Sequence, residues 1–275
     1  MDLTIVAVYT ICDDLLISLG HQDDPRAKMS DAEVMTTALI AARYFGGNQQ
    51  TACAALKTLG YIPNMLGHSR FNRRLHQVSE HFQTLFQVLA EGFKAENSEN
   101  IYSIDTFPVA VCDNIRISRS HLYQGPDWHG RIASKRRYFY GLKAHLMVTE
   151  TGKIVEAFFT PGRCSDVLGL RCYAFDLPQG SVVYADKAYC NYGIEDALAA
   201  SGISLKPIRK KNAKRQYPPH EVYLQHFHRK RVEVTNSLIE QLFPKSIHAV
   251  TAVGFELKVF LFIIATSIRQ LFGEE

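Results

Sequence analysis

One apolar stretch decides the fold of this 275-residue chain: Tyr102-Ser103-Ile104-Asp105-Thr106-Phe107. Its aromatic and β-branched residues predict a strand over residues 101–111, with Asp105 inside it. Aspartate is depleted in strands, because a carboxylate within a sheet is costly unless it is paired or bound to a metal. Asp105 is therefore a candidate catalytic or metal-binding residue. The structural alternative is a buried hydrogen bond or ion pair.

A second acid ends another strand-like run, Val182-Val183-Tyr184-Ala185-Asp186. Ligand sites of open α/β sheets lie at the carboxyl ends of strands, so Asp186 is a second candidate catalytic or metal-binding residue. The structural alternative is that Asp186 simply forms a turn. A third candidate, Glu233, belongs to a long helix expected over residues 221–243. Taken alone, Arg229 and Glu233 form an ordinary i, i+4 surface pair, worth about 0.2–0.5 kcal/mol.

The long helix offers a rival for the third acid, because Glu240 lies one heptad beyond Glu233 on the same face. Apolar residues of a surface helix normally face the core of the protein. The core side of this helix is predicted to consist of its apolar residues Phe227, Val234, Leu238 and Leu242.

Strand-like and helix-like segments alternate around the two aspartates. Strands that first form a hairpin and then alternate with helices indicate a mixed α/β sheet. Gly152 suits the turn of the hairpin, since glycine adopts positive φ without strain. Strands are expected at 139–149, 153–160, 181–185 and 203–208, and helices at 166–175, 193–200 and 221–243.

The first 95 residues have a helical pattern. Ser30 and Glu33 form a capping box, and a second helix is expected over residues 49–59. Apolar residues at helical spacing over 71–93 predict a third helix. We therefore expect a small all-α region at 1–95, followed by a catalytic domain at 96–275. Two interpretations of the helical region stay open: a helix-turn-helix that binds DNA, or a packing or dimerisation element.

Positive charge is clustered although the net charge is only +4. Residues 206–231 contain nine Lys or Arg and one acid, and residues 116–143 contain seven and one. A single cluster is usually a solvated loop, whereas two clusters beside candidate acids favour a polyanion such as nucleic acid. The first segment also carries Tyr123 and Trp128, which are expected either to stack on a base or to anchor the loop.

Several protein classes are disfavoured. The six cysteines form no Cys-x-x-Cys pair, and no His-Glu-x-x-His motif occurs, which argues against a zinc hydrolase. Trp128 is the only tryptophan, so a glycosidase would lack aromatic sugar platforms and would have no use for clustered Lys and Arg. The sequence contains neither a signal peptide nor an apolar run long enough to span a bilayer. A cytoplasmic, nucleoid-associated protein is expected.

In the segments 102–108, 183–189 and 229–233, the chain resembles the DDE transposases of bacterial insertion sequences, and among them the insertion-sequence family nine-eighty-two. Residues 140–145 are similar to the second strand of that family, and the resemblance covers about residues 65–270. The signature Tyr-x-x-Arg-x-x-x-Glu-x(6)-Lys of related families is matched at Arg229 and Glu233. Here, however, His226 replaces the tyrosine and Glu240 the lysine.

The resemblance implies an RNase H-like fold with a five-stranded mixed sheet flanked by helices. It implies that Asp105, Asp186 and Glu233 bind Mg²⁺, or Mn²⁺ in its place, because these cations prefer oxygen ligands. The implied reaction is cleavage at the terminal repeats of an element in double-stranded DNA, followed by transfer of the 3′-OH ends by a homodimer. Two alternatives share this sequence pattern: a nuclease without strand transfer, and a non-catalytic DNA-binding regulator. The residues expected to bind DNA are Arg73, Arg74, Arg136, Arg137, Arg209, Lys210, Lys211, Lys214, Arg215, Arg229 and Lys230.

Overall fold

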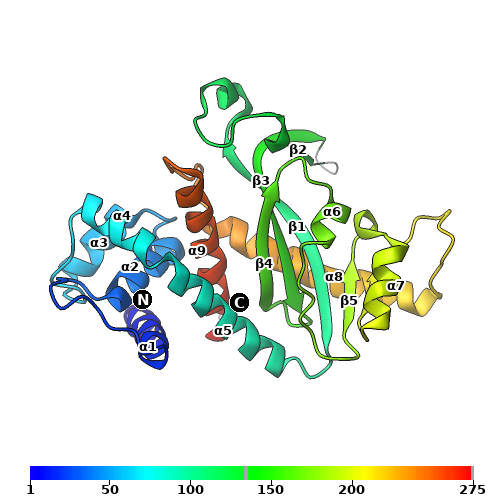
Figure 1. Cartoon of the computed structure of the whole chain (residues 1–275), viewed down its shortest axis with the longest axis horizontal. Helices are drawn as coiled ribbons and strands as arrows, with labels where there is room; N and C mark the ends of the chain where they lie inside the picture. The colour runs from blue at the N-terminus through cyan, green and yellow to red at the C-terminus, as the bar shows by residue number, and fades with distance from the viewer. Residues whose placement is uncertain (133–135, 274–275) are drawn as a thin grey trace. The chain divides into compact units, whose positions relative to one another are not determined.

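A computed structural model describes residues 1–132 and 136–273 (Figure 1). Its contacts divide the chain into two compact units, Met1–Leu89 with Ile239–Glu275 (unit 1) and Ala90–Leu238 (unit 2). The helices are α1 (Asp2–Ser18), α2 (Asp31–Tyr44), α3 (Gln49–Thr58), α4 (His68–Gln77), α5 (Ser79–Glu96), α6 (Asp166–Leu170), α7 (Tyr192–Ala200), α8 (Pro219–Leu242) and α9 (Ala252–Leu271). The strands are β1 (Ile101–Cys112), β2 (His129–Ile132), β3 (Arg137–Thr149), β4 (Ile154–Pro161), β5 (Val182–Ala185) and β6 (Ser204–Pro207), and the 3-10 helices are η1 (Asn114–Arg119), η2 (Pro126–Trp128) and η3 (Lys187–Tyr189).

Unit 2 is built on one mixed sheet. Its strands follow the order β2-β3-β1-β5-β6, with β4 paired to β3 along the segment that β2 leaves unpaired. Strand β1 is central, since it runs antiparallel to β3 and parallel to β5. With helices flanking it (Figure 1), this is the RNase H-like arrangement, so the expected fold class is confirmed. The short strand β2 is an addition to the expected five.

The hairpin of β3 and β4 forms as predicted. Gly152 has a φ of +86° in the turn, and its N–H donates to the carbonyl oxygen of Thr149 at 2.9 Å. A second glycine, Gly141, has a φ of +152° where β3 passes close to β1. A Cβ there would lie 2.2 Å from the carbonyl oxygen of Val109, so only glycine fits without moving the backbone.

Unit 1 is helical, as expected for the N-terminal region. Helix α2 begins with the predicted capping box of Ser30 and Glu33 and is buried along most of its length. It packs against α1, α3, α4 and the apolar α9. The unit thus includes a C-terminal helix that the division at residue 95 assigned to the catalytic domain. Within the described residues, no helix is both long and apolar enough to cross a membrane.

Two predicted helices have different limits. The helix expected over 71–93 is interrupted at Val78, where the Ser79 hydroxyl donates to the carbonyl oxygen of His76 at 2.8 Å. Val78 is itself buried, so the apolar spacing continues through the break and conceals it. The helix expected over 166–175 ends at Leu170. Beyond it, the Tyr173 hydroxyl donates to the carbonyl oxygen of Leu146 at 3.0 Å and draws the chain towards β3.

The predicted core side of α8 is wrong. Phe227 and Val234 are 44% and 56% exposed, and the helix instead buries a largely polar face. This face binds the sheet by hydrogen bonds, because Thr235 Oγ1 donates to the carbonyl oxygen of Gly152 at 2.7 Å. Because the prediction used the apolar residues alone, it assigned the wrong face of α8 to the core. The buried residues of α8 are Gln225, His228, Val232, Thr235, Asn236 and Ile239.

Candidate active site

Asp105 lies at the centre of the sheet of unit 2. Strand β1 carries it between β3 and β5, where the register of β1 and β3 places it opposite Leu146. Desolvation by burial raises the pKa of this carboxyl to about 7. The backbone N–H of Thr106 and the charge of Arg229 lower its pKa, whereas the charges of Glu233 and Asp186 raise it. The central strand thus holds a carboxyl that is costly to ionise and that lies near the other two candidate acids.

Asp186 lies beside Asp105 because of strand register. In the parallel pair of β1 and β5, Ile104 is opposite Ala185, so the two aspartates occupy the next position on each strand. Neighbouring strands are about 4.8 Å apart, and side chains at matched positions point to the same face. Asp186 is half-buried and starts η3, at the carboxyl end of β5. The sheet itself therefore pairs the two acids.

Glu233 on α8 is linked to Asp186 by the side chain of Arg229. The Arg229 Nη1 donates to Asp186 Oδ1 at 3.1 Å, and its Nη2 donates to Glu233 Oε1. Burial lowers the pKa of Arg229, and its bond to Glu233 and the charge of Asp186 more than offset this effect, so its pKa is raised. One guanidinium thus bridges two of the three carboxylates. The rival Glu240 lies seven residues on, about 10 Å along the helix axis.

Polar contacts fix α8 on the sheet. The Ser103 hydroxyl, two residues before Asp105, donates to the carbonyl oxygen of His228 at 3.1 Å. The His228 ring stacks on Tyr184 of β5, with ring centroids 4.9 Å apart and an interplanar angle of 4°. These contacts set the axial position of α8, and with it the position of Glu233 relative to the aspartates.

Asn236 is a site residue that sequence reasoning missed. Its Nδ2 lies 3.4 Å from Asp105 Oδ2, and its Oδ1 is buried with no hydrogen-bond partner among the described residues. A spacing of three and four between Gln225, His228, Val232 and Asn236 was the signal that could have found it. That spacing marks a buried helix face even though most of its members are polar.

A divalent cation fits this set of donors. Mg²⁺ and Mn²⁺ prefer oxygen ligands, and the site offers three carboxylates and the amide oxygen of Asn236. A single guanidinium, that of Arg229, is bonded to two of these acids. His145 on β3 has its pKa lowered to about 4 by burial, so it is uncharged at neutral pH. Its Nε2 bonds Thr160 Oγ1 at 2.8 Å, away from the acids.

A second ion pair, of Lys143 with Asp166, lies next to β1. Lys143 Nζ donates to Asp166 Oδ1 at 2.9 Å and to the carbonyl oxygen of Cys164 at 2.8 Å. Thr106 Oγ1, next to Asp105, lies 3.4 Å from the same Asp166 oxygen. This network ties β1 and β3 to the start of α6 and so limits movement of the strand that holds Asp105.

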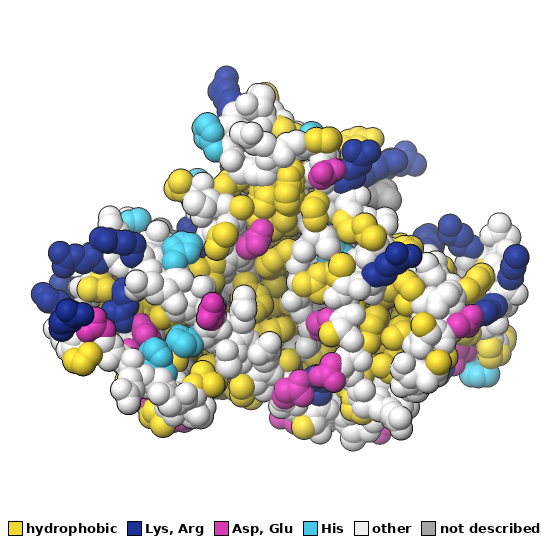
Figure 2. Space-filling model, in the orientation of Figure 1, with side chains coloured by type: hydrophobic (Ala, Val, Ile, Leu, Met, Phe, Trp, Pro, Cys, Tyr) yellow, Lys and Arg dark blue, Asp and Glu magenta, His cyan; other side chains and the backbone are white. Residues whose placement is uncertain are grey.

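The basic residues expected to bind DNA fall into two groups. Figure 2 shows Lys and Arg side chains on the surface over the loop that follows β6. Ion pairs within the protein occupy Arg74 with Asp31, Arg209 with Glu195, Arg215 with Asp196, and Arg229 with Asp186 and Glu233. Exposed side chains are those of Arg73, Arg136, Arg137, Lys210, Lys211, Lys214 and Lys230. Residues 133–135 of the first basic segment lie outside the described residues.

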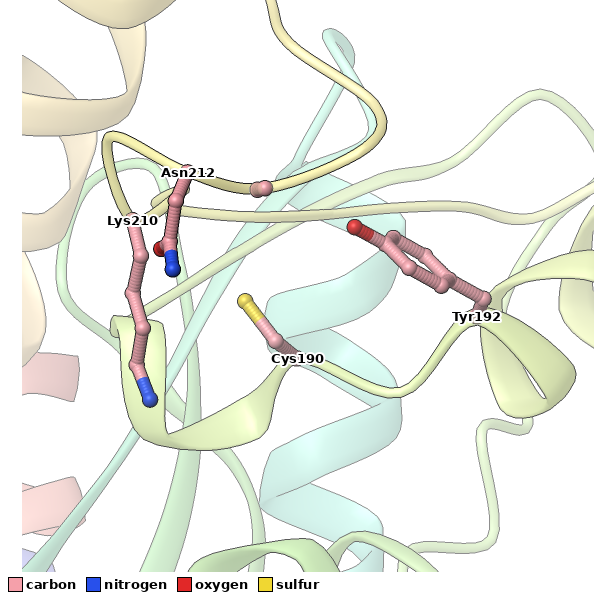
Figure 3. A pocket seen from close by; sticks show the side chains of 5 residues that line it. Cys190, Tyr192, Lys210 and Asn212 are labelled. Atoms are coloured by element: carbon pink, nitrogen blue, oxygen red, sulfur yellow. The ribbon is translucent and has the colours of Figure 1, made fainter.

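Arg209 is a structural residue of the basic loop. Its side chain is 5% exposed and donates two hydrogen bonds to Glu195, which is also buried. The guanidinium lies over the rings of Tyr192 and Tyr217, 5.0 and 4.9 Å from their centroids. A pocket of about 180 Å³ opens beside it, lined by Cys190, Tyr192, Lys210, Asn212 and Ala213 (Figure 3).

In the first basic segment, the aromatic pair anchors the loop. Tyr123 is buried, and its ring lies 4.3 Å from that of Trp128. The Tyr140 hydroxyl of β3 donates to the carbonyl oxygen of Tyr123. The two rings therefore contact each other, as expected for the structural alternative.

Comparison with known proteins identifies the family of the chain. The sequence profile of the family described as "Transposase DDE domain" matches residues 95–258, more than half of the chain. Among solved structures, the chain is similar to a piggyBac transposase synaptic complex with hairpin DNA, at 10% identity and a TM-score of 0.48, covering 100% of this chain and 74% of that one. It is also similar to the Mos1 strand transfer complex, at 10% identity and a TM-score of 0.25, covering 81% and 79%. No curated protein matches the chain.

The profile match includes both strands that carry the aspartates and the helix that carries Glu233. The chain therefore belongs to the family of proteins with a DDE transposase domain.

Proposed function

We propose that this chain is the transposase of a bacterial insertion sequence, of the insertion-sequence family nine-eighty-two. It cleaves phosphodiesters at the terminal inverted repeats of the element and transfers the 3′-OH ends to target DNA. One observation supports the proposal: Asp105 and Asp186 occupy matched positions on neighbouring strands, and the Arg229 guanidinium bonds both Asp186 and Glu233 of the helix.

The three acids and Asn236 would hold Mg²⁺, or Mn²⁺ in its place. When bound, such ions activate the attacking oxygen and stabilise the leaving oxygen of a phosphodiester. Because the pKa of Asp105 is raised to about 7, binding of a cation at this carboxyl would be favoured by higher pH. Arg229 would bind a phosphate oxygen, a role supported by its contact with two of the acids and by its half-buried guanidinium.

The exposed lysines on the loop between β6 and α8 would bind the DNA backbone. Lys210, Lys211 and Lys214 are exposed, and the loop is held in place by the buried pair of Arg209 and Glu195. Because Lys side chains neutralise phosphates without contacting base edges, they contribute affinity for double-stranded DNA of any sequence. We propose a homodimer as the active form, since transposition joins two DNA ends, and the nucleoid of the cytoplasm as its location.

Cleavage of DNA that bears the flanking ends of the gene tests the proposal. The wild-type chain and the Asp186→Asn variant are compared with Mg²⁺, with Mn²⁺ and with EDTA. We expect nicking at the ends with either cation, no nicking with EDTA, and none with the variant. Circular dichroism and DNA binding of the variant serve as controls, because the variant should fold and bind as the wild type does.

The outcomes separate the alternatives. Joining of the cut 3′ ends to a target plasmid supports a transposase, whereas cleavage without joining indicates a nuclease. Binding without cleavage in any cation overturns the catalytic proposal and indicates a DNA-binding regulator. Glu233→Gln and Glu240→Gln distinguish the two glutamates: only the first should abolish nicking.

A further inference from the structure

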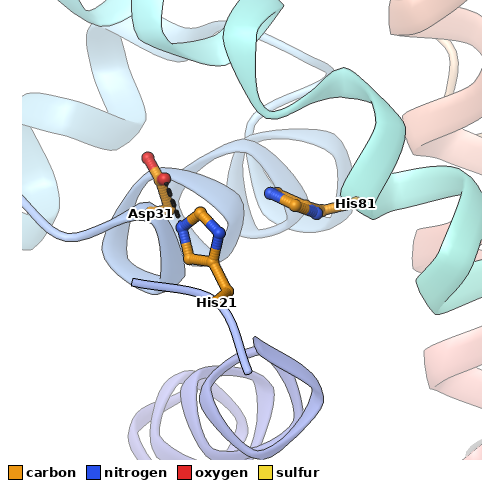
Figure 4. A group of neighbouring side chains, drawn as sticks. All are labelled: His21, Asp31 and His81. Carbon is orange, nitrogen blue, oxygen red and sulfur yellow. Dashed lines mark hydrogen bonds and ion pairs between the residues drawn. The ribbon is translucent and has the colours of Figure 1, made fainter. Parts of the chain in front are cut away.

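Two histidines and an aspartate from three segments of unit 1 lie together (Figure 4). His21 follows α1, Asp31 is the first residue of α2, and His81 lies in the first turn of α5. One ligand atom from each lies within 4.8 Å of the other two. These segments are up to 60 residues apart in the sequence, so the cluster is a product of the fold.

The Asp31 carboxylate is held by two partners. Its Oδ2 lies 2.8 Å from His21 Nε2, and its Oδ1 accepts a hydrogen bond from Arg74. A carboxylate that binds a metal normally has such an outer partner, which fixes its orientation. The Arg74 contact thus leaves Oδ2 directed at the histidines, and it explains why this arginine is not exposed.

His81 completes the cluster. Its ring meets that of His21 edge to face, with centroids 4.8 Å apart and an interplanar angle of 70°. In Figure 4, one ring nitrogen of His21 meets the Asp31 carboxylate, and its other ring nitrogen lies on the side of His81. The hydrogen bond with Asp31 accounts for the position of His21 but gives no role to His81, whereas a shared cation accounts for all three side chains.

The ligand types select the cation. Imidazole nitrogens suit Zn²⁺ and other borderline ions, whereas Mg²⁺ prefers oxygen alone. Tetrahedral zinc, with bonds of about 2.0–2.1 Å, places its ligand atoms about 3.4 Å apart. A fourth ligand is close, since Asp23 Oδ1 lies 3.7 Å from His21 Nε2. His21 Nε2 therefore has aspartate oxygens at 2.8 and 3.7 Å, either side of the tetrahedral spacing, and His81 offers a ring nitrogen within 4.8 Å of His21 and Asp31.

We propose that His21, Asp31 and His81 bind Zn²⁺, with Asp23 or a water as the fourth ligand. The ion ties the connection between α1 and α2 to the start of α5, so it stabilises the helical unit. It differs in place and in cation from the carboxylate site of unit 2, and it does not depend on the proposed transposition.

Zinc binding by the full-length chain tests this proposal. The protein is stripped with EDTA, dialysed and titrated with ZnCl₂, and bound zinc and thermal unfolding are measured. We expect one tightly bound zinc per chain and a rise in Tm of about 5 °C. His81→Gln should weaken zinc binding at least about tenfold and abolish the rise. Asp31→Asn is avoided, because it would also disrupt the contact with Arg74.

Two variants serve as controls. His68→Gln removes an exposed histidine at the start of α4 in the same unit and should bind zinc as the wild type does. Asp105→Asn alters the carboxylate site and should likewise keep its zinc. In the metal-free state, equal circular dichroism spectra of His81→Gln and the wild type establish that the variant folds. The proposal is overturned if the stripped wild type binds no zinc, or if His81→Gln and His68→Gln bind it equally.

Discussion

Asn236 lies 3.4 Å from the carboxylate of Asp105, although 131 residues separate the two in the sequence. The amide belongs to the same helix as Glu233, three residues further on. Any shift of the helix that moves Glu233 therefore also moves the partner of Asp105. The contact therefore links Asp105 on the sheet to the helix that carries Glu233.

Asn236→Ala should lower the rate of DNA cleavage by about 10- to 100-fold and raise the Mg²⁺ concentration required, because it removes both an amide oxygen that would bind the cation and the N–H group that contacts the Asp105 carboxylate. Nicking rates across a Mg²⁺ titration measure both effects. Ser237→Ala is the matched control, since within residues 1–132 and 136–273 its hydroxyl bonds only the Glu233 carbonyl oxygen of the same helix. Equal rates for the two variants would show that Asn236 has no part in the reaction.

The raised pKa of Asp105 predicts how stability depends on pH. With a pKa of about 7 in the folded state against an ordinary 3.8, the carboxyl stabilises the fold fully below pH 3.8 and loses this effect as the pH rises through 7. Asp105→Asn lacks this ionisation. In EDTA, the wild type should therefore lose on the order of 1–2 kcal/mol relative to the variant between pH 4 and pH 8, an amount reduced for partial solvent access.

Urea unfolding of both proteins across this pH range measures the difference. Asp113→Asn, at an exposed aspartate just after β1, should follow the wild-type curve. Parallel curves for the wild type and Asp105→Asn would contradict a raised pKa.

Arg209→Met should destabilise unit 2 by about 3–5 kcal/mol, because it leaves the buried Glu195 carboxylate without its partner. Lys210→Met, at the exposed neighbour, should change stability by no more than about 0.5 kcal/mol. Chemical denaturation compares the two. A similar small loss for both would mean that Arg209 is solvated in solution and free to bind DNA.

Lys211→Ala together with Lys214→Ala should weaken binding to all DNA sequences alike. The slope of log affinity against log salt concentration should fall by about 1.8, since each neutralised phosphate contributes about 0.9. Replacing the same two lysines with arginine keeps the charge and should keep the slope. The prediction fails if the alanine variant retains the wild-type slope.

The strands and the two aspartates could be predicted from local sequence. Asp105 and Asp186 interrupt or end short apolar runs rich in β-branched and aromatic residues, which favour strands. Glu233 could be found only through its resemblance to a family, because its local pattern is that of a surface pair. The choice between Glu233 and Glu240 depends on the axial position of the helix, which the contact between Ser103 and His228 sets.

The errors share one physical cause. Phe227 and Val234 were expected in the core because they are apolar, yet α8 meets the sheet through hydrogen bonds and leaves both exposed. Val78 is buried at a helix break, so apolar spacing alone could not reveal the break. Apolar periodicity reports burial. It does not show where a helix is interrupted, and it does not detect a buried helix face made of polar residues.

The register that pairs Ile104 with Ala185 restricts where the chain can change in length during evolution. Inserting one residue into β1 ahead of Asp105, or into β5, would turn one aspartate to the opposite face of the sheet. No such constraint applies to the excursion from the sheet, which is the connection between Cys112 and β2 that contains η1 and η2. This connection begins after β1 and ends before β3, so its length does not affect the register of either aspartate. Relatives should therefore differ in length in that excursion and keep the strand segments around both aspartates free of insertions.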